Sequence, residues 1–373
     1  MQKRPDYPGL RERSGFSWHV SATYLALLDI TGIPIRDFNV RPEAGIELFR
    51  RGRSSLREMY GSELGLPGLM TPPISYGHVN ALGVDLLFPE GGEVNYVRSR
   101  LSLEEWCKVL ARTTDYTCAG LVKVFQAYQQ RMERAFPGEK VSLSWGYEGP
   151  MTTAYELRDM AVFTDAADQP ELFGRFLDLA TKSIVDFARF MRRLRGEPEM
   201  NPVSSGLCDD VASMFGPDMW RSFVLPSWET YYTGLTTGTR GVHVEDLRPN
   251  QLRFLEDAAI SNYDPSISAR ITPKVIASAT RVPFGWRLAN FHYAGLTETE
   301  VKEWVFQAVA DGASQVFSYV CAGMCTQPML RKVQAFTEAC RESKRMLDSG
   351  ATRADVGGNV SPAGRARFWA RWP

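Results

Sequence analysis

The segment GVHVEDL and a cysteine much later in the chain carry side chains of the kinds that bind transition metals. His243 and Glu245 stand two residues apart, and Cys321 directly follows the apolar run QVFSYV. Zinc takes imidazole nitrogen, carboxylate oxygen and thiolate sulfur, and catalytic zinc keeps one position open. Side chains two apart on a strand face the same way, so His243 and Glu245 could both bind one ion. The three residues are therefore candidate metal ligands, and the soft thiolate favours zinc over magnesium.

The same residues also admit a purely structural interpretation, which the sequence leaves open. A histidine and a distant cysteine do not make a recognised metal motif by their spacing. His243 would then be a hydrogen-bonded histidine beneath loops, and Glu245 an acid near the N-terminus of the next helix. Asp209 and Asp210 follow another apolar run, and they could equally cap a short helix that begins near Val211.

Short apolar or β-branched runs alternate with longer amphipathic segments along most of the chain. Such alternation is typical of a parallel sheet with crossover helices. The runs that we predict to be strands are VDLLF (84–88), KVSLSW (140–145), MAVFT (160–164), VSSGL (203–207), RGVHV (240–244), AAISNY (258–263), VPFGWRL (282–288) and QVFSYV (315–320). Helices are predicted over 117–136, 171–194, 297–312 and 329–347.

Eight predicted strands separated by helices favour a closed (β/α)₈ TIM barrel, an α/β fold in a single domain. An open doubly wound sheet is the alternative, but no Gly-x-Gly-x-x-Gly follows any predicted strand. We expect residues 1–70 to form an N-terminal extension of helices and loops packed on the barrel. The barrel itself is predicted over residues 71–348, with a C-terminal tail over 349–373. Catalytic groups of a barrel sit where its strands end.

The overall composition is that of an ordinary globular protein without a strong charge. Lys+Arg and Asp+Glu both number 43, so nothing favours nucleic acid or an anionic membrane as a partner. No apolar stretch of about 18 residues exists, and the N-terminus lacks the apolar core of a signal peptide. The 6 cysteines are scattered, which is typical of reduced thiols. We therefore expect a cytoplasmic protein.

Several segments resemble the uroporphyrinogen decarboxylase superfamily in the same order along the chain. They are TPPISYGHVNALGVDLLFPEGGE (71–93), GYEGPMTTAYELRD (146–159), GLCDDVASMFGPDMWRSFVLP (206–226), GVHVEDL (241–247) and VCAGMCTQPML (320–330). The superfamily also includes zinc methyltransferases, which move methyl groups between corrinoid proteins and thiols such as coenzyme M.

The resemblance favours the methyltransferase branch over the decarboxylases. The decarboxylases carry an aspartate before an Ala-Leu-Gly, whereas PPISYGHVN precedes Ala81-Leu82-Gly83 here and contains none. The methyltransferases carry His-x-Cys-Gly at one strand end and a cysteine at a later one. His243 and Cys321 match that pattern, while Glu245 stands in the place of the middle cysteine.

The resemblance thus implies a zinc-dependent methyltransferase with His243, Glu245 and Cys321 as ligands. Tyr155, Asp210 and His78 would line the pocket, with His78 as a proton carrier near neutral pH. The corrinoid would sit on a separate partner protein, because the chain has no Asp-x-His-x-x-Gly motif. We expect a small-molecule substrate and leave assembly as a homodimer open.

Two other functions remain open at this stage. One is a metal-free decarboxylase or lyase that acts on an aromatic or tetrapyrrole-like acid, with Asp210, His243 and Glu245 in acid–base roles. The other is a binding protein that has lost catalysis, which the incomplete motifs would explain. The metal content of the purified protein separates the first of these from the zinc enzyme.

Overall fold

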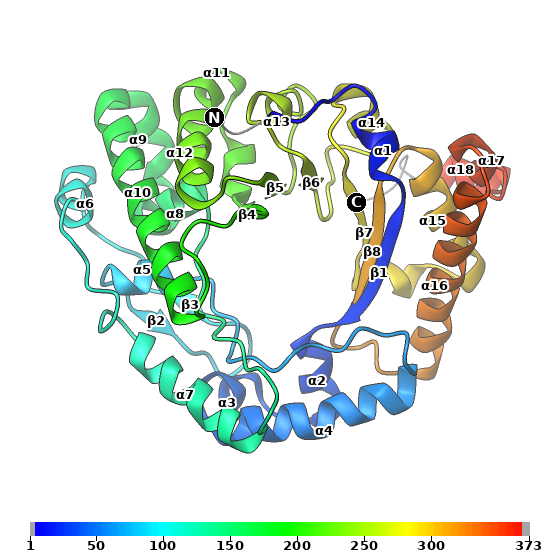
Figure 1. Ribbon diagram of the computed structural model, residues 1–373, viewed down its shortest axis with the longest axis horizontal. Coiled ribbons are helices and arrows are strands. Elements are labelled where there is room, and N and C mark those ends of the chain that lie inside the picture. The colour runs from blue at the N-terminus through cyan, green and yellow to red at the C-terminus, as the bar shows by residue number, and fades with distance from the viewer. Residues whose placement is uncertain (1–3, 368–373) are drawn as a thin grey trace. The chain divides into compact units, whose positions relative to one another are not determined.

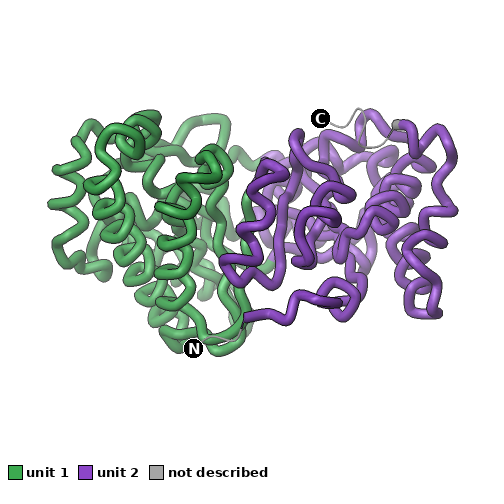
Figure 2. Tube along the Cα trace, turned by 90° about the horizontal axis from the view of Figure 1, so that it is seen from above, with its two compact units in different colours: residues 1–3, 33–47, 68–244 green, residues 4–32, 48–67, 245–373 purple. Residues whose placement is uncertain are grey.

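The computed structural model describes residues 4–367 as a chain of helices and short strands (Figure 1). Helices alternate with short parallel strands from residue 204 onward. The chain divides into two compact units, coloured separately in Figure 2. Unit 1 comprises Ile33–Glu47 and Gly68–Val244, and unit 2 comprises Arg4–Gly32, Leu48–Pro67 and the chain from Glu245 onward. Helix α4 (Pro42–Tyr60) begins in unit 1 and ends in unit 2.

Unit 1 is predominantly helical and contains two short pairs of strands. Its elements are α3 (Ile35–Val40), α5 (Gly77–Ala81), β2 (Leu86–Leu87), β3 (Asn95–Tyr96), α6 (Leu103–Leu110), α7 (Val122–Ala135), α8 (Pro150–Arg158), α9 (Ala161–Asp168), α10 (Pro170–Leu194), β4 (Ser204–Cys208), the 3₁₀ helix η1 (Asp210–Met214), α11 (Pro217–Met219), the π-helix η2 (Trp220–Val224), α12 (Leu225–Leu235) and β5 (Thr239–His243). β4 and β5 pair in parallel, and β2 and β3 pair antiparallel.

Unit 2 is built on a parallel sheet with strand order β1-β8-β7. Its elements are α1 (Leu10–Ser14), β1 (Ser17–Ala22), α2 (Tyr24–Thr31), α13 (Phe254–Asp257), β6 (Asn262–Asp264), α14 (Pro273–Ala279), β7 (Gly285–Leu288), the 3₁₀ helix η3 (Asn290–Gly295), α15 (Glu298–Ala310), β8 (Gln315–Val320), α16 (Gln327–Asp348), α17 (Arg353–Gly357) and α18 (Pro362–Arg367). α16 packs against β1 and α15 against β8.

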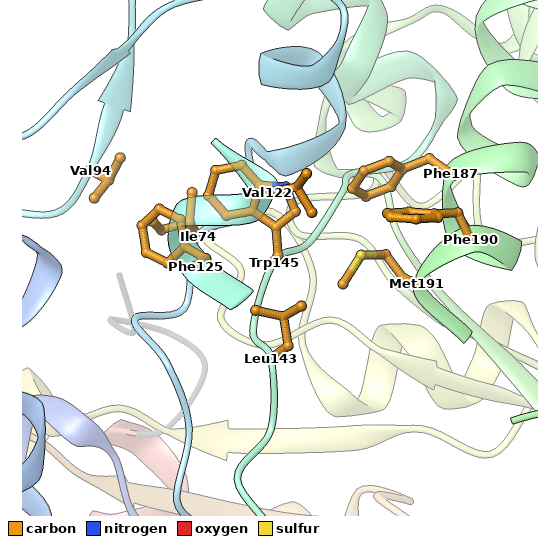
Figure 3. Packing of buried hydrophobic residues seen from close by; sticks show 9 residues of the cluster. All are labelled: Ile74, Val94, Val122, Phe125, Leu143, Trp145, Phe187, Phe190 and Met191. Atoms are coloured by element: carbon orange, nitrogen blue, oxygen red, sulfur yellow. The ribbon is translucent and has the colours of Figure 1, made fainter. Parts of the chain in front are cut away.

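Aromatic and aliphatic side chains from distant segments form a buried cluster in unit 1 (Figure 3). Its members are Ile74, Val94, Val122, Phe125, Leu143, Trp145, Phe187, Phe190 and Met191. The rings of Phe125 and Trp145 stack with centroids 4.6 Å apart. Gly77 lets α5 approach this cluster, because a Cβ atom there would lie 2.8 Å from the Trp145 ring. Trp145 therefore anchors the start of the loop 146–149, which leads into α8.

The structure confirms most predicted helices and strands and corrects others. β8 and α10 match their predictions closely. MAVFT is instead helical in α9, since periodicity alone cannot separate a short apolar run in a strand from one in a helix. KVSLSW forms only isolated bridges to Met70 and Ile74.

The expected N-terminal extension holds a strand that the sequence analysis missed. β1 lies within residues 1–70 and pairs with β8 along its whole length, from Ser17 beside Gln315 to Ala22 beside Val320. Its polar alternation, SWHVSA, conceals it, because only Val20 and Ala22 are buried. The predicted C-terminal tail contains α17 and α18, and its last residues, 368–373, lie outside the described range.

The structure shows a mixed α/β fold with parallel strands, in agreement with the predicted α/β class. Within residues 4–367 the hydrogen-bonded strands form three small sheets of two or three strands each. In the same range, no helix combines the length and hydropathy that a membrane crossing requires.

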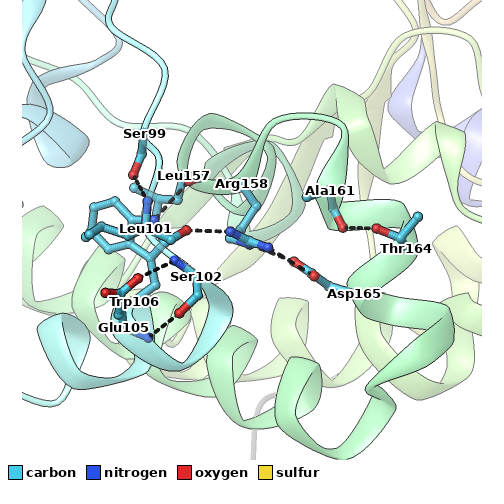
Figure 4. Close-up of polar contacts among 10 residues, drawn as sticks. All are labelled: Ser99, Leu101, Ser102, Glu105, Trp106, Leu157, Arg158, Ala161, Thr164 and Asp165. Atoms are coloured by element: carbon cyan, nitrogen blue, oxygen red, sulfur yellow. Dashed lines mark hydrogen bonds and ion pairs between the residues drawn. The ribbon is translucent and has the colours of Figure 1, made fainter.

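A buried ion pair ties α8 to α9 beside the N-terminus of α6 (Figure 4). Arg158 donates to Asp165 from Nε at 2.6 Å and from Nη2 at 3.1 Å, and it also donates to the carbonyl oxygen of Leu101. Only 15% of the Arg158 side chain and 7% of the Asp165 side chain are exposed. Ser102 begins α6 with a capping box that it shares with Glu105.

We expect Asp165→Ala to lower the free energy of unfolding by about 3–5 kcal/mol, because it leaves a buried guanidinium without its counter-ion. Asp178→Ala is the matched control, since it removes the exposed Asp178–Lys182 pair of α10 and should cost less than about 1 kcal/mol. Urea denaturation of both variants measures the difference. Equal losses would contradict a structural role for the buried pair.

Candidate metal centre

Cys208 and His243 lie side by side at the ends of two adjacent strands of unit 1. β4 and β5 pair in parallel, and Cys208 is the register partner of His243. The backbone N–H of Asp209 donates to the carbonyl oxygen of His243 at 3.1 Å and continues the pairing by one residue. Partners in register on parallel strands project to the same face of the sheet. A thiol and an imidazole therefore meet at the carboxyl edge of this strand pair.

Asp210 completes a group of three donors with Cys208 and His243. One ligand atom from each residue lies within 4.8 Å of the other two. Nε2 of His243 is 3.7 Å from Oδ1 of Asp210, and Sγ of Cys208 is 3.9 Å from Oδ2 of the same carboxylate. Donors on a tetrahedral zinc ion with ordinary bond lengths are separated by roughly 3.3–3.8 Å. The donor types therefore fit a zinc ion, and the separations of 3.7 and 3.9 Å lie close to that range.

The surroundings of the three donors are acidic. Glu148 accepts hydrogen bonds from Cys208 and Ser75, and burial raises the pKa of Glu148. Burial, followed by the nearby Glu148 and Asp210 carboxylates, also raises the pKa of the Cys208 thiol. Burial and the neighbouring Glu148 raise the pKa of Glu156 well above its usual value. A divalent cation at this position would offset the mutual repulsion of these groups and favour the thiolate.

Asp209 holds the framework of the site together. Its Oδ1 accepts the N–H of Thr152 in the first turn of α8 at 2.7 Å, and its Oδ2 accepts Nε1–H of Trp228 on α12 at 2.7 Å. Burial raises the pKa of Asp209 to about 7, although the bonds from Trp228 and Thr152 favour the ionised form. The side chain is fully buried, so it connects β4 with two helices and does not point to solvent.

Gly149 allows the N-terminus of α8 to approach the end of β4. Its N–H donates to the carbonyl oxygen of Cys208 at 2.6 Å, and a Cβ atom at this position would lie 2.5 Å from Cβ of Asp209. Any side chain here would push the two segments apart. The glycine therefore sets the distance between the Glu148 loop and the Cys208 strand end.

The residues that the sequence analysis assigned to catalysis occupy different environments. Asp210 belongs to the donor group. Tyr155 lies half-buried on α8, with its ring 6.4 Å from that of Phe163. His78 is 1% exposed on α5, and its Nε2 lies 2.9 Å from Oγ of Ser183. Burial lowers the pKa of His78 to about 3, so its ring is neutral near pH 7. Our proposal therefore gives His78 no role as a proton carrier.

The three predicted metal ligands are divided between the two units. His243 ends β5 in unit 1, whereas Glu245 and Cys321 belong to unit 2. Cys321 is buried directly after β8 and accepts a hydrogen bond from Thr23 at 3.6 Å. A set made of His243, Glu245 and Cys321 thus remains a prediction.

The sequence patterns gave no role to Cys208 or Glu148. The register of β4 against β5 brings Cys208 to His243, and no local motif encodes that register. The available signal was that VSSGL and RGVHV are both followed at once by polar residues of ligand type. When two such strands are neighbours in a sheet, the polar residues that follow them can lie close together.

The fold and the donor group define a mixed α/β protein with a candidate metal centre at the carboxyl edge of a parallel strand pair. Among solved structures, the chain is similar to a methyltransferase from Methanosarcina mazei, with a TM-score of 0.62. The two sequences are 17% identical over 90% of this chain and 97% of that chain. At this identity the similarity shows a common fold. No protein-family model matches the sequence, and no curated protein matches it either.

Proposed function

We propose that the protein is a zinc-dependent methyltransferase that moves a methyl group between a corrinoid protein and a thiol acceptor. The observation that carries the proposal is the group formed by Cys208, Asp210 and His243, whose donor atoms lie within 4.8 Å of one another. Support comes from the fold, which a methyltransferase from Methanosarcina mazei also has. We further propose that the complete fold is a (β/α)₈ barrel of the uroporphyrinogen decarboxylase superfamily.

Each residue of the site has a defined role in this proposal. Cys208, Asp210 and His243 hold the ion, and both Asp210 and His243 are exposed enough, at 43% and 30% of their side chains, for a substrate to reach them. Zinc at this position would supply Lewis-acid chemistry, which lowers the pKa of a thiol. Glu148 lies beside the Cys208 thiol and contributes to the raised pKa of that thiol. Asp209 keeps β4 and α8 in the geometry that brings these groups together.

The donor set in this proposal differs from the one that the sequence predicts. It keeps His243, gives Asp210 a ligand role, and uses Cys208 as the thiolate in place of Cys321. The two sets make opposite predictions for substitution of the two cysteines.

Elemental analysis of the purified full-length chain tests the proposal directly. We expect one zinc per chain, and after replacement by cobalt(II) we expect an absorption band of thiolate-to-cobalt charge transfer. Demethylation of methylcobalamin by a small thiol, followed through the corrinoid spectrum, then measures activity. Protein without bound metal, and without uptake of added zinc or cobalt, would rule out the zinc site.

A metal-free lyase is the second candidate, and the carboxyl groups beside the site favour it. Burial raises the pKa of both Glu148 and Glu156, as expected of carboxylic acids that donate protons near neutral pH. On this alternative the purified chain contains no zinc, and chelators leave its activity unchanged. Stoichiometric zinc whose removal abolishes activity would contradict it.

A further inference from the structure

One face of the β1-β8-β7 sheet in unit 2 carries a polar and aromatic group that the proposed function does not use. The register places His19, Phe317 and Arg287 in one row across the three strands, which lie side by side in Figure 1. Tyr319 stands two residues beyond Phe317 on the same face. The rings confirm this arrangement, because His19 stacks on Phe317 with centroids 5.2 Å apart and lies 5.8 Å from Tyr319.

The opposite face of the same strands is ordinary protein core. Val316 and Val320 of β8 are fully buried, and Val20 of β1 is 5% exposed. α15 and α16 pack against these strands. A sheet covered on one side by helices needs only apolar side chains there. The His19–Arg287 row lies on the other face of the sheet, so packing against α15 and α16 does not account for it.

Arg287 is a partly buried cation that forms no ion pair within residues 4–367. Nη1 donates to Oγ of Ser266 at 3.1 Å, and the guanidinium lies over the Tyr319 ring at 5.1 Å. Its Nε is buried and has no hydrogen-bond partner, and no carboxylate of residues 4–367 forms an ion pair with it. A buried N–H without a partner is costly, and the N–H groups of a guanidinium match the geometry of a carboxylate.

The loop after β6 keeps Ser266 in place under Arg287. Ser266 is 1% exposed and has a φ of 50°, which is unusual for a residue with a side chain. Its N–H donates to Oδ1 of Asp264 at 2.7 Å. Such strain is retained where the surrounding structure over-determines it, and it is frequent at ligand sites.

The remaining groups on this face determine the charge that it accepts. Burial lowers the pKa of His19 by more than the nearby Asp264 carboxylate raises it, so the imidazole is neutral near pH 7. Burial and then Asp264 raise the pKa of Tyr319, which stays a neutral phenol. Arg287 therefore supplies the positive charge, and Asp264 would repel a second negative charge on a ligand.

We propose that this face binds a planar monocarboxylate, with the carboxylate on Arg287 and the ring against His19 and Tyr319. The inference is independent of the proposed metal centre, because every residue that carries it belongs to unit 2. Phe317 lies on β8, the middle strand, and its ring stacks on that of His19. Gly285 leaves room for Phe317, because a Cβ atom at Gly285 would lie 3.0 Å from Phe317 Cε1.

Calorimetric titration of the full-length chain after chelation tests this inference separately from metal binding. The probes are benzoate, its neutral analogue benzamide and the dianion isophthalate. We expect benzoate to bind most tightly, and Arg287→Gln to weaken it on the order of tenfold to a hundredfold with little effect on benzamide. Arg331→Gln is the control, since Arg331 is exposed and pairs with Glu298.

Two further variants keep the test decisive if Arg287→Gln does not fold. Arg287→Lys retains the charge without the planar fork and should weaken benzoate less than the glutamine variant would. Tyr319→Leu should weaken benzoate, whereas Tyr319→Phe should not, because the ring is retained. Failure of the wild-type chain to bind benzoate, or equal affinity for benzoate and benzamide, would overturn the proposal.

Discussion

Replacing Cys208 with alanine should lower the affinity for zinc by on the order of a hundredfold or more and abolish methyl transfer. Loss of a residue that merely supports a ligand already costs about 10–100-fold in metal affinity, and removal of a ligand should cost at least as much. His243→Ala should have the same effect, because both residues lie within 4.8 Å of the third donor. Zinc content and the cobalt(II) charge-transfer band report the loss without reference to activity.

Two cysteine controls make this result specific. Cys118→Ala removes an exposed thiol and should change neither metal content nor activity. Cys321→Ala separates the two ligand sets, since it should leave the zinc content intact if Cys208 supplies the thiolate. If Cys321→Ala loses zinc and Cys208→Ala keeps it, the sequence-derived set of His243, Glu245 and Cys321 is correct and our donor set is wrong.

Replacing Asp209 with alanine should lower the free energy of unfolding by about 3–5 kcal/mol. The substitution leaves two buried donors, the N–H of Thr152 and Nε1–H of Trp228, without an acceptor. Each buried donor left unsatisfied costs about 1–3 kcal/mol, and the end of β4 loses its side-chain link to α8. Urea denaturation monitored by tryptophan fluorescence and by circular dichroism measures the loss.

Companion variants apportion this effect. Asp209→Asn keeps one acceptor but faces the other donor with its own N–H₂, so we expect an intermediate loss. Trp228→Phe removes one of the two bonds, and a double-mutant cycle with Asp209→Ala isolates the coupling between Trp228 and Asp209. Asp218→Ala is the surface control, with an expected change within about 0.5 kcal/mol. A loss as small as that control would contradict the clamping role of Asp209.

Sequence patterns predicted those elements whose hydrophobic pattern is long or unambiguous. α10 carries an apolar stripe over its whole length, and its predicted bounds differ from the observed ones by a single residue. QVFSYV is apolar, bounded by turns and β-branched, and it is β8. Hydrophobic patterns did not predict the correct element where polar residues alternate with buried ones or where the apolar run is short. β1 exposes His19 and Ser21 on a polar face, and MAVFT is too short to reveal its helical period.

The sequence by itself determined the α/β class, most helices, and the positions of polar residues that follow the predicted strands. It also singled out His243 as a candidate metal ligand and Asp210 as a candidate catalytic residue. Only the tertiary structure decided which of these residues meet, because a ligand group depends on strand order and register, and neither is encoded in a local pattern. The pairing of β4 with β5 brings Cys208 beside His243, and the pairing of β1 with β8 and β7 brings His19 into one row with Arg287.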